Sequence, residues 1–313
     1  MKNLTRSETA QILLAHNNYA IVTHRRPDGD TLGSSALLCM GLRQLGKNAH
    51  ILENPEITPK YAHLHHGLCK PKAEAGDFVV SVDVASAKML PEVFLELPYD
   101  LRIDHHGNAT SFTPVELVEP GAAACGEIVY HVLMAMGAEL DIPMAEALYT
   151  AVSTDTGCFR YANTTADTLL VAAACKAAGA DTFAINQALF ETNSLARLKV
   201  QAYMLQNAVF LQEGKIAVCA LPKAVEAACG AGEDDLDNIS GFPRSIEGVK
   251  LAVTIREEGE GKVKMSARAV PGCDASALCA KFGGGGHKGA AGASMNMPMD
   301  EAVNAVIAQL PIL

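Results

Sequence analysis

The sequence predicts an α/β protein of two domains, an N-terminal domain built on a parallel sheet and a smaller C-terminal α/β domain. Short strand-like runs alternate with helical patterns through the first two hundred residues, as in a sheet whose parallel strands are joined by helices. The 313 residues exceed one domain of about 150 residues. We expect the first domain at residues 1–190, a linker helix at 191–208 and the second domain at 209–313.

Hydrophobic periodicity and helix-ending glycines predict the elements of the first domain. Strands are expected at Ala20–Thr23, Phe78–Val82 and Leu101–Ile103. Helices are expected at Ser7–His16, at Thr31–Leu45 before Gly46, and at Gly126–Met136 before Gly137.

From Ala145 to about Asn207 the pattern is helical throughout. Its last part begins after Ser194, a candidate N-cap, and repeats apolar residues at spacings of three and four: Leu195, Leu198, Ala202, Leu205 and Val209. Two heptads are too few for an independent coiled coil. We therefore expect a connecting helix with this stripe buried against a domain.

The second domain begins where strand-like runs return. These runs are Val209–Leu211, Ile216–Val218, Val249–Ile255 and Val263–Ala269. Two helical patterns, Ala275–Phe282 and Met299–Leu310, follow them.

Composition and charge restrict the partners. The chain carries 25 Lys and Arg against 35 Asp and Glu, a net charge of −10, which argues against long duplex nucleic acid as a ligand. A short anionic substrate in a local pocket remains compatible with this charge. The longest uncharged stretch, Thr9–His24, is shorter than the 18 or more apolar residues of a membrane-spanning helix, so no membrane partner is expected. Nine cysteines without a C-x-x-C pair suit a reducing compartment, and we expect a cytoplasmic protein.

Acidic and histidine side chains follow each predicted strand of the first domain. Ala20–Thr23 leads into His24, Asp28 and Asp30, Phe78–Val82 leads into Asp83, and Leu101–Ile103 leads into Asp104, His105 and His106. Asp155 ends the helical pattern that begins at Ala145. Because ligands bind at the carboxyl ends of parallel strands, these groups are expected at one edge of the sheet.

The charge of this cluster points to metal ions. Four aspartates within a few ångströms cannot all stay ionised without a counter-charge, and two divalent cations supply it. Carboxylate and imidazole ligands without thiolate favour manganese, magnesium or cobalt over a structural zinc. One aspartate after a strand is more often a helix N-cap or a turn former, but four segments agree here.

A glycine run near the C-terminus is the second candidate site. Gly283 to Gly286 precede His287 and Lys288, and we expect Gly284, Gly285 and Gly286 to offer backbone N–H groups to an anion, beside Arg268. The run follows a predicted helix rather than a strand, so the dinucleotide-binding interpretation is weak. A flexible surface turn is the plain alternative.

Two further features receive structural interpretations. His63, His65 and His66 lack a carboxylate at ligand spacing, so a surface or core-edge role is favoured over a metal site. The chain has no Trp and few aromatic residues, which argues against an extended base-stacking platform.

Taken together, these motifs resemble the DHH phosphoesterase family, named for the triplet seen here as Asp104-His105-His106. The resemblance covers nearly the whole chain, from the His24 motif to the Gly-Gly-Gly-Gly-His of the DHH-associated domain. It is strongest to the stand-alone nanoRNase and pAp phosphatase branch, where pAp is adenosine 3′,5′-bisphosphate.

The resemblance implies two manganese ions. One would be held by His24, Asp28 and Asp83, and the other by Asp30, Asp83, His105 and Asp155. His106 would then face the substrate as a catalytic group, and Asp104 would orient the histidines. By the same resemblance Arg268, His287 and the glycine run would grip a phosphate from across the interdomain cleft.

The implied activity is hydrolysis of short oligoribonucleotides to 5′-mononucleotides, or of pAp to AMP and phosphate. The alternative within the enzymes is a phosphodiesterase for linear or cyclic dinucleotides such as pGpG or c-di-AMP. A manganese pyrophosphatase and a nucleotide-binding module without metals rank behind. The oligomeric state stays open, with a homodimer through the first domain among the alternatives.

Overall fold

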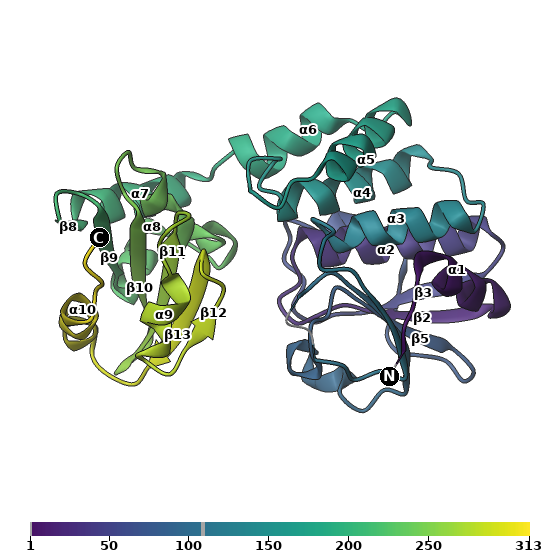
Figure 1. Ribbon diagram of the computed structural model, residues 1–313, viewed down its shortest axis with the longest axis horizontal. Coiled ribbons are helices and arrows are strands. Elements are labelled where there is room, and N and C mark those ends of the chain that lie inside the picture. The colour runs from purple at the N-terminus through teal and green to yellow at the C-terminus, as the bar shows by residue number, and fades with distance from the viewer. Residues whose placement is uncertain (1, 108–109) are drawn as a thin grey trace. The chain divides into compact units, whose positions relative to one another are not determined.

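The computed structural model describes residues 2–107 and 110–313 and divides into two compact units, Met1–Thr192 and Asn193–Leu313 (Figure 1). The first unit contains a parallel sheet covered by helices, and the second contains a smaller mixed sheet. The predicted α/β class is therefore confirmed, including the parallel sheet of the N-terminal domain.

The sheet of the first unit has the strand order β1-β7-β6-β5-β2-β3-β4, and every pair of neighbours in it is parallel. Its strands are β1 (Lys2–Asn3), β2 (Asn18–Val22), β3 (Asn48–Leu52), β4 (Cys69–Lys70), β5 (Phe78–Val82), β6 (Tyr99–Asp104) and β7 (Val115–Val118). The predicted strands correspond to β2, β5 and β6, which lie side by side in the middle of the sheet. The outer strands were not predicted from the sequence, and two of them are only two residues long.

The helices of the first unit form two layers on the sheet. They are α1 (Arg6–Ala15), α2 (Gly29–Gln44), α3 (Cys125–Ala135), α4 (Ile142–Asp155), α5 (Ala166–Ala177) and α6 (Thr182–Asn186), followed by a π-helical turn at Gln187–Glu191. Figure 1 shows α2 and α3 between the sheet and the outer layer of α4, α5 and α6. Short 3-10 helices η1 (Ala62–His65), η2 (Ala87–Met89) and η3 (Glu92–Phe94) occupy connecting loops.

Helix α2 is buried on almost all sides because it lies between the sheet and α4. Glycines make this close packing possible. A Cβ atom at Gly33 would lie 2.4 Å from the carbonyl oxygen of Ala147 in α4. Since α2 begins and α4 ends at candidate site residues, this contact fixes their separation.

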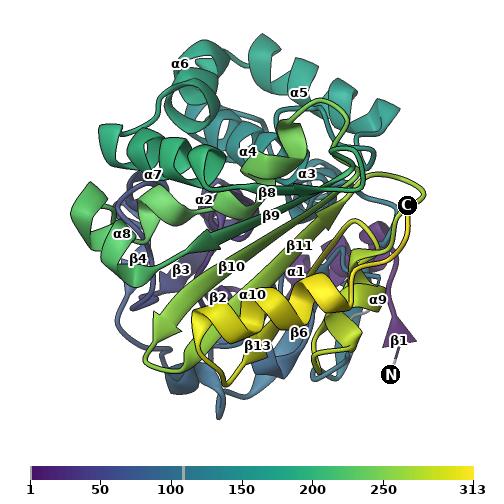
Figure 2. The same ribbon diagram turned by 90° about the vertical axis from the view of Figure 1, so that its left-hand side faces the viewer.

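The second unit has the strand order β12-β13-β11-β10-β9-β8. Its strands are β8 (Val209–Leu211), β9 (Ile216–Leu221), β10 (Leu251–Gly259), β11 (Lys262–Ala269), β12 (Gly285–Gly286) and β13 (Ala290–Met295). Its helices are α7 (Leu195–Gln206), α8 (Lys223–Cys229), α9 (Ala275–Ala280) and α10 (Met299–Ala308), with 3-10 helices η5 (Asp234–Leu236) and η6 (Ile239–Ser245). Residues of α7 and α8 pack on one face of this sheet, whereas α9 and α10 pack on the other (Figure 2).

The expectation for the stripe on the linking helix is wrong. Leu195, Leu198 and Leu205 are exposed, and the buried residues of α7 are Val200 and Met204. These two side chains pack against Cys219 of β9 and its neighbours within the second unit. Both faces of α7 carry apolar residues at helical spacing, and only the position of the sheet decides which face is buried. Ser194 does cap the helix, because its hydroxyl accepts a hydrogen bond from the N–H of Arg197.

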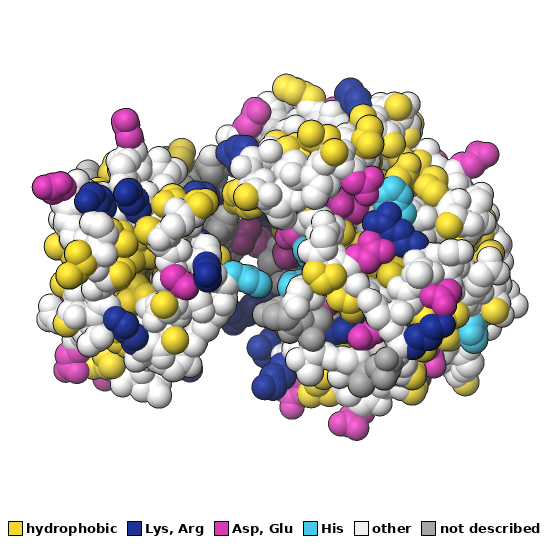
Figure 3. Space-filling model, in the orientation of Figure 1, with side chains coloured by type: hydrophobic (Ala, Val, Ile, Leu, Met, Phe, Trp, Pro, Cys, Tyr) yellow, Lys and Arg dark blue, Asp and Glu magenta, His cyan; other side chains and the backbone are white. Residues whose placement is uncertain are grey.

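Exposed apolar side chains also lie over the outer helices of the first unit. Leu169 and Leu170 of α5 and Phe183 of α6 are among them, and Figure 3 shows hydrophobic side chains over this layer. In the described part of the chain, no helix is both long enough and apolar enough to cross a membrane.

Candidate active site

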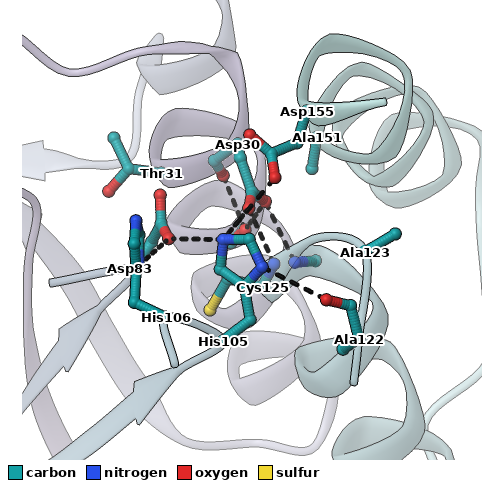
Figure 4. A network of polar contacts seen from close by, with 12 residues as sticks. Asp30, Thr31, Asp83, His105, His106, Ala122, Ala123, Cys125, Ala151 and Asp155 are labelled. Carbon is teal, nitrogen blue, oxygen red and sulfur yellow. Dashed lines mark hydrogen bonds and ion pairs between the residues drawn. The ribbon is translucent and has the colours of Figure 1, made fainter. Parts of the chain in front are cut away.

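Three neighbouring strands bring the predicted ligands to one edge of the sheet of the first unit. His24 follows β2, Asp83 follows β5, and His105 follows β6. The remaining groups come from helix ends, with Asp28 and Asp30 at the start of α2 and Asp155 at the end of α4. Figure 4 shows the carboxylates of Asp30, Asp83 and Asp155 gathered around the imidazole of His105.

These side chains form groups with the spacing of metal ligands. His24, Asp28 and Asp83 make one group, Asp30, His105 and Asp155 make a second, and Asp83 with His105 and His106 makes a third. Within each group the ligand atoms lie within 4.8 Å of one another. Two atoms that each lie about 2.1 Å from one cation are roughly 3 to 4 Å apart. The separations from His105 Nε2 to Asp30 Oδ2 and Asp155 Oδ2, 3.7 and 3.6 Å, fall in this range.

Asp83 lies between the groups. Its Oδ2 is 3.7 Å from His24 Nε2, whereas its Oδ1 is 3.5 Å from His105 Nε2. The two oxygens of one carboxylate thus face two different sets of ligands. Asp83 also has a φ of 60°, which is uncommon for a residue with a side chain, and its N–H donates to Ile103 O at 2.9 Å. This strained backbone fixes the direction of the carboxylate.

Asp28 and Asp30 are positioned by helix termini. Asp28 is the N-cap of α2, and its Oδ1 accepts the N–H groups of Asp30 and Thr31 at 3.0 and 3.1 Å. Asp28 therefore has the ordinary capping role and also faces His24 at 3.8 Å. Asp30 is buried, and its carboxylate accepts the N–H groups of Cys125 and Gly126 at the start of α3, at 2.7 and 3.0 Å.

Burial and mutual repulsion raise the pKa values of Asp30, Asp83 and Asp155, whereas His24 and two backbone N–H groups hold the pKa of Asp28 below its ordinary value. Burial, followed by the charge of Asp30, raises the pKa of Asp155 to about 8. The same two causes raise the pKa of Asp83 well above its ordinary value. Burial alone would lower the pKa of His24, but Asp28 and Asp83 raise it well above 6.5. The metal-free cluster therefore holds protons that bound cations would displace.

His106 and Asp104 form a separate pair. Nδ1 of His106 lies 2.8 Å from Asp104 Oδ1, and the same oxygen accepts the N–H of His105. Burial opposes ionisation of Asp104, yet His106 and then Arg102 hold the pKa of this carboxyl below its ordinary value. The orienting role of Asp104 is compatible with this geometry.

Three groups that support the site were not predicted from the sequence. Ser34 donates its hydroxyl to Asp30 Oδ1 at 2.7 Å. The backbone N–H groups of Cys125 and Gly126, 95 and 96 residues further along the chain, donate hydrogen bonds to the same carboxylate. Arg102 is fully buried, bonds Glu116 at 2.6 Å and lies 3.9 Å from Asp104. The i, i+4 spacing of Ser34 from Asp30 was the only local signal.

The glycine run of the second unit is a strand and turn rather than an open ring of N–H groups. The N–H of Gly284 donates to Cys279 O, and the N–H of His287 donates to Ala290 O. Gly285 and Gly286 pair with β13, where a Cβ atom at Gly286 would lie 2.7 Å from Ala290 O. The N–H of Gly284, one of the expected donors, is thus already used within the protein, as is the neighbouring N–H of His287.

The side chains beside this turn remain candidates for anion contacts. His287 and Lys288 are exposed at the tip of the hairpin. Arg268 of β11 pairs with Ala290, so its register places it next to the same hairpin. Three basic side chains therefore cluster at one end of the second sheet.

Comparison with known proteins gives two matches that together span most of the chain. Residues 18–152 match the model described as "DHH family, N-terminal domain", and residues 215–310 match the DHHA1 domain. The chain is 33% identical over 291 residues to "Bifunctional oligoribonuclease and PAP phosphatase NrnA" of Thermus thermophilus. That alignment covers 92% of this chain and 87% of the relative.

Two solved structures share the fold. An exopolyphosphatase-related protein from Bacteroides fragilis superposes with a TM-score of 0.84 at 24% identity, over 97% of this chain and 94% of its own. The exonuclease RecJ bound to manganese superposes with a TM-score of 0.53 at 15% identity, over 99% of this chain and 94% of its own.

Proposed function

We propose that this chain, which belongs to the DHH family, is a manganese-dependent phosphoesterase that hydrolyses short oligoribonucleotides to 5′-mononucleotides and pAp to AMP and phosphate. The observation that carries the proposal is the set of ligand groups that share Asp83 between them. The 33% identity to a bifunctional oligoribonuclease and PAP phosphatase over 92% of the chain supports the choice of substrates.

The donor set suits two hard divalent cations. Carboxylate oxygens and imidazole nitrogens without thiolate are the ligands that manganese and magnesium prefer. Asp83 Oδ1 is buried and has no hydrogen-bond partner among the described residues, as expected of an oxygen kept for a cation. We propose His24, Asp28 and Asp83 as ligands of one ion and Asp30, Asp83, His105 and Asp155 as ligands of the other. When bound, the cations neutralise phosphate charge and lower the pKa of water.

The chain's own residues orient the reacting groups. The reaction is in-line attack of water on phosphorus with loss of the 3′-oxygen of the ribose, and that oxygen needs a proton as it leaves. Because Nδ1 of His106 faces Asp104, Nε2 is the ring atom that donates this proton. Asp104 holds the ring and stabilises its charged form, as a buried carboxylate does for a catalytic histidine.

The same bond is broken in both substrates, since pAp and RNA each carry an ester at the ribose 3′-oxygen. This shared chemistry accounts for one site with two activities. The basic side chains of the second unit, Arg268, His287 and Lys288, are our candidates for binding a phosphate or nucleotide of the substrate.

The test is hydrolysis of pAp, of labelled RNAs of two to five nucleotides, and of pGpG and c-di-AMP, each with manganese, magnesium or no metal. We expect AMP and phosphate from pAp, and mononucleotides from RNA, only when a divalent cation is present. An Asp83→Ala chain serves as the inactive control. Hydrolysis of pGpG or c-di-AMP without pAp or RNA would assign the chain to the dinucleotide phosphodiesterases instead.

A further inference from the structure

We propose that Arg25, Arg26 and Lys88 of the first unit form an anion subsite for the phosphate that is not hydrolysed. On pAp this is the 5′-phosphate, and on a short RNA it is a phosphate one nucleotide away from the reacting bond. The inference rests on the proposed function and adds to it the groups that recognise a second phosphate.

These three basic side chains lie in the loops that also carry the candidate metal ligands. Arg25 and Arg26 lie between His24 and Asp28, so each is within two residues, at most about 7 Å of extended chain, of a candidate ligand. Lys88 lies in η2, the helix that follows Asp83. The N–H of Arg25 donates to the carbonyl of Met89 at 2.7 Å, which joins the two loops next to Lys88.

The loop that carries the arginines is fixed through its backbone. Nδ1 of His24 lies 2.8 Å from the carbonyl of Arg25. The buried Asn54 donates to Thr23 Oγ1 and to His24 O at 2.9 and 2.8 Å. Arg26 has a φ of 49°, an uncommon conformation for a residue with a side chain. Strain of this kind is found where a surrounding structure holds a functional segment in place.

The side chains themselves are uncommitted. Arg25, Arg26 and Lys88 are exposed, and in the described part of the chain none of the three has a side-chain hydrogen bond or an ion pair. Other arginines are engaged, as Arg6 is by Glu119 and Arg256 by Glu226. Three unpaired cations beside a ligand cluster are unexpected in a protein with ten more acidic than basic residues.

A negatively charged phosphate of the substrate is the partner that we propose for Arg25, Arg26 and Lys88. Two divalent cations balance the four aspartates of the cluster and leave no counter-charge within the cluster for the second phosphate of pAp. Arginine binds phosphate through two parallel N–H groups, and lysine adds a point charge. A subsite of this kind would favour substrates with a second phosphate over those with only the reacting one.

The experiment compares pAp with adenosine 3′-monophosphate, which lacks only the 5′-phosphate. We expect the ratio of kcat/KM for pAp to that for 3′-AMP to fall about tenfold in Arg25→Gln/Arg26→Gln. Lys88→Gln should lower the ratio less, and Arg25→Lys/Arg26→Lys should restore part of it. The matched control Lys176→Gln/Lys199→Gln removes two charges from exposed positions of α5 and α7 and should keep the wild-type ratio.

An unchanged ratio in Arg25→Gln/Arg26→Gln overturns the inference. An equal loss on both substrates also overturns it, because the arginines would then act through the metal loop. A wild-type chain that hydrolyses neither compound refutes the pAp phosphatase part of the proposed function but not the subsite. In that case the binding of pAp is measured by calorimetry in the presence of Ca²⁺, for the wild-type chain and for Arg25→Gln/Arg26→Gln. Weaker binding by the double variant supports the subsite, and equal binding overturns it.

Discussion

Replacing Gly33 by alanine tests whether the contact between α2 and α4 holds the proposed metal ligands Asp30 and Asp155 at their separation. The added methyl group would lie 2.4 Å from the carbonyl oxygen of Ala147 and 3.0 Å from the Cβ of Ala151. Both atoms belong to α4 and cannot rotate away. The helices must therefore move apart, and this movement separates Asp30 on α2 from Asp155 on α4.

The expected loss of stability is about 2 kcal/mol. Overpacking of a close-packed contact costs about 1–3 kcal/mol, and a rigid backbone neighbour favours the upper end. Alanine in place of glycine inside a helix stabilises the helix by about 1 kcal/mol, which offsets part of this cost. For a unit of this size the difference lowers Tm by roughly 4–8 °C. Displacing a ligand by about 1 Å should also reduce kcat up to about a hundredfold.

Gly41→Ala is the matched control because it lies in the same helix. There the methyl group would meet the Cδ1 of Leu133 at 2.5 Å, the end of a side chain that can change rotamer. We expect its stability to stay within about 1 kcal/mol of wild type. Thermal unfolding followed by circular dichroism, with and without manganese, and hydrolysis of pAp measure both variants. A Gly33→Ala chain that melts at or above the wild-type temperature with full activity refutes the reasoning.

Three further predictions concern the site. Asp83→Asn should lose more bound metal and more activity than any other single ligand variant, because Asp83 is the residue proposed to bind both ions; wild-type metal content by mass spectrometry would contradict this. His287→Ala should raise KM for pAp with the metal content intact, and an unchanged KM counts against its role. The raised pKa of Asp155, about 8 against about 3.9 in an unfolded chain, means that the folded metal-free protein holds a proton that the unfolded chain releases. The free energy of unfolding should therefore fall as pH rises from about 4 to 8, and manganese should raise Tm more at pH 8 than at pH 5; a metal-free Tm that rises over this interval would disprove the sign.

Local chemistry explains why so much of the candidate site could be predicted. Parallel strands end at one edge of their sheet, so acidic and histidine residues that follow β2, β5 and β6 must lie near one another once the fold class is recognised. Asp28 shows the limit of such reasoning, because its side chain is both a helix N-cap and a neighbour of His24. An aspartate just before a helix is expected both of an N-cap and of a metal ligand, so the sequence pattern cannot separate the two roles.

The sequence by itself determined the α/β class, the central strands of the first sheet and the residue types that gather in the candidate site, since these depend on periodicity and on residues close in the chain. Only the tertiary structure decided which face of α7 is buried, how the start of α3 grips Asp30, and that the glycine run pairs with β13. It alone joined the Arg25 loop to the loop of Lys88. Except for the pairing of β12 with β13, which joins residues close in the chain, these features arise from contacts between residues far apart in the chain, and no local pattern encodes such contacts.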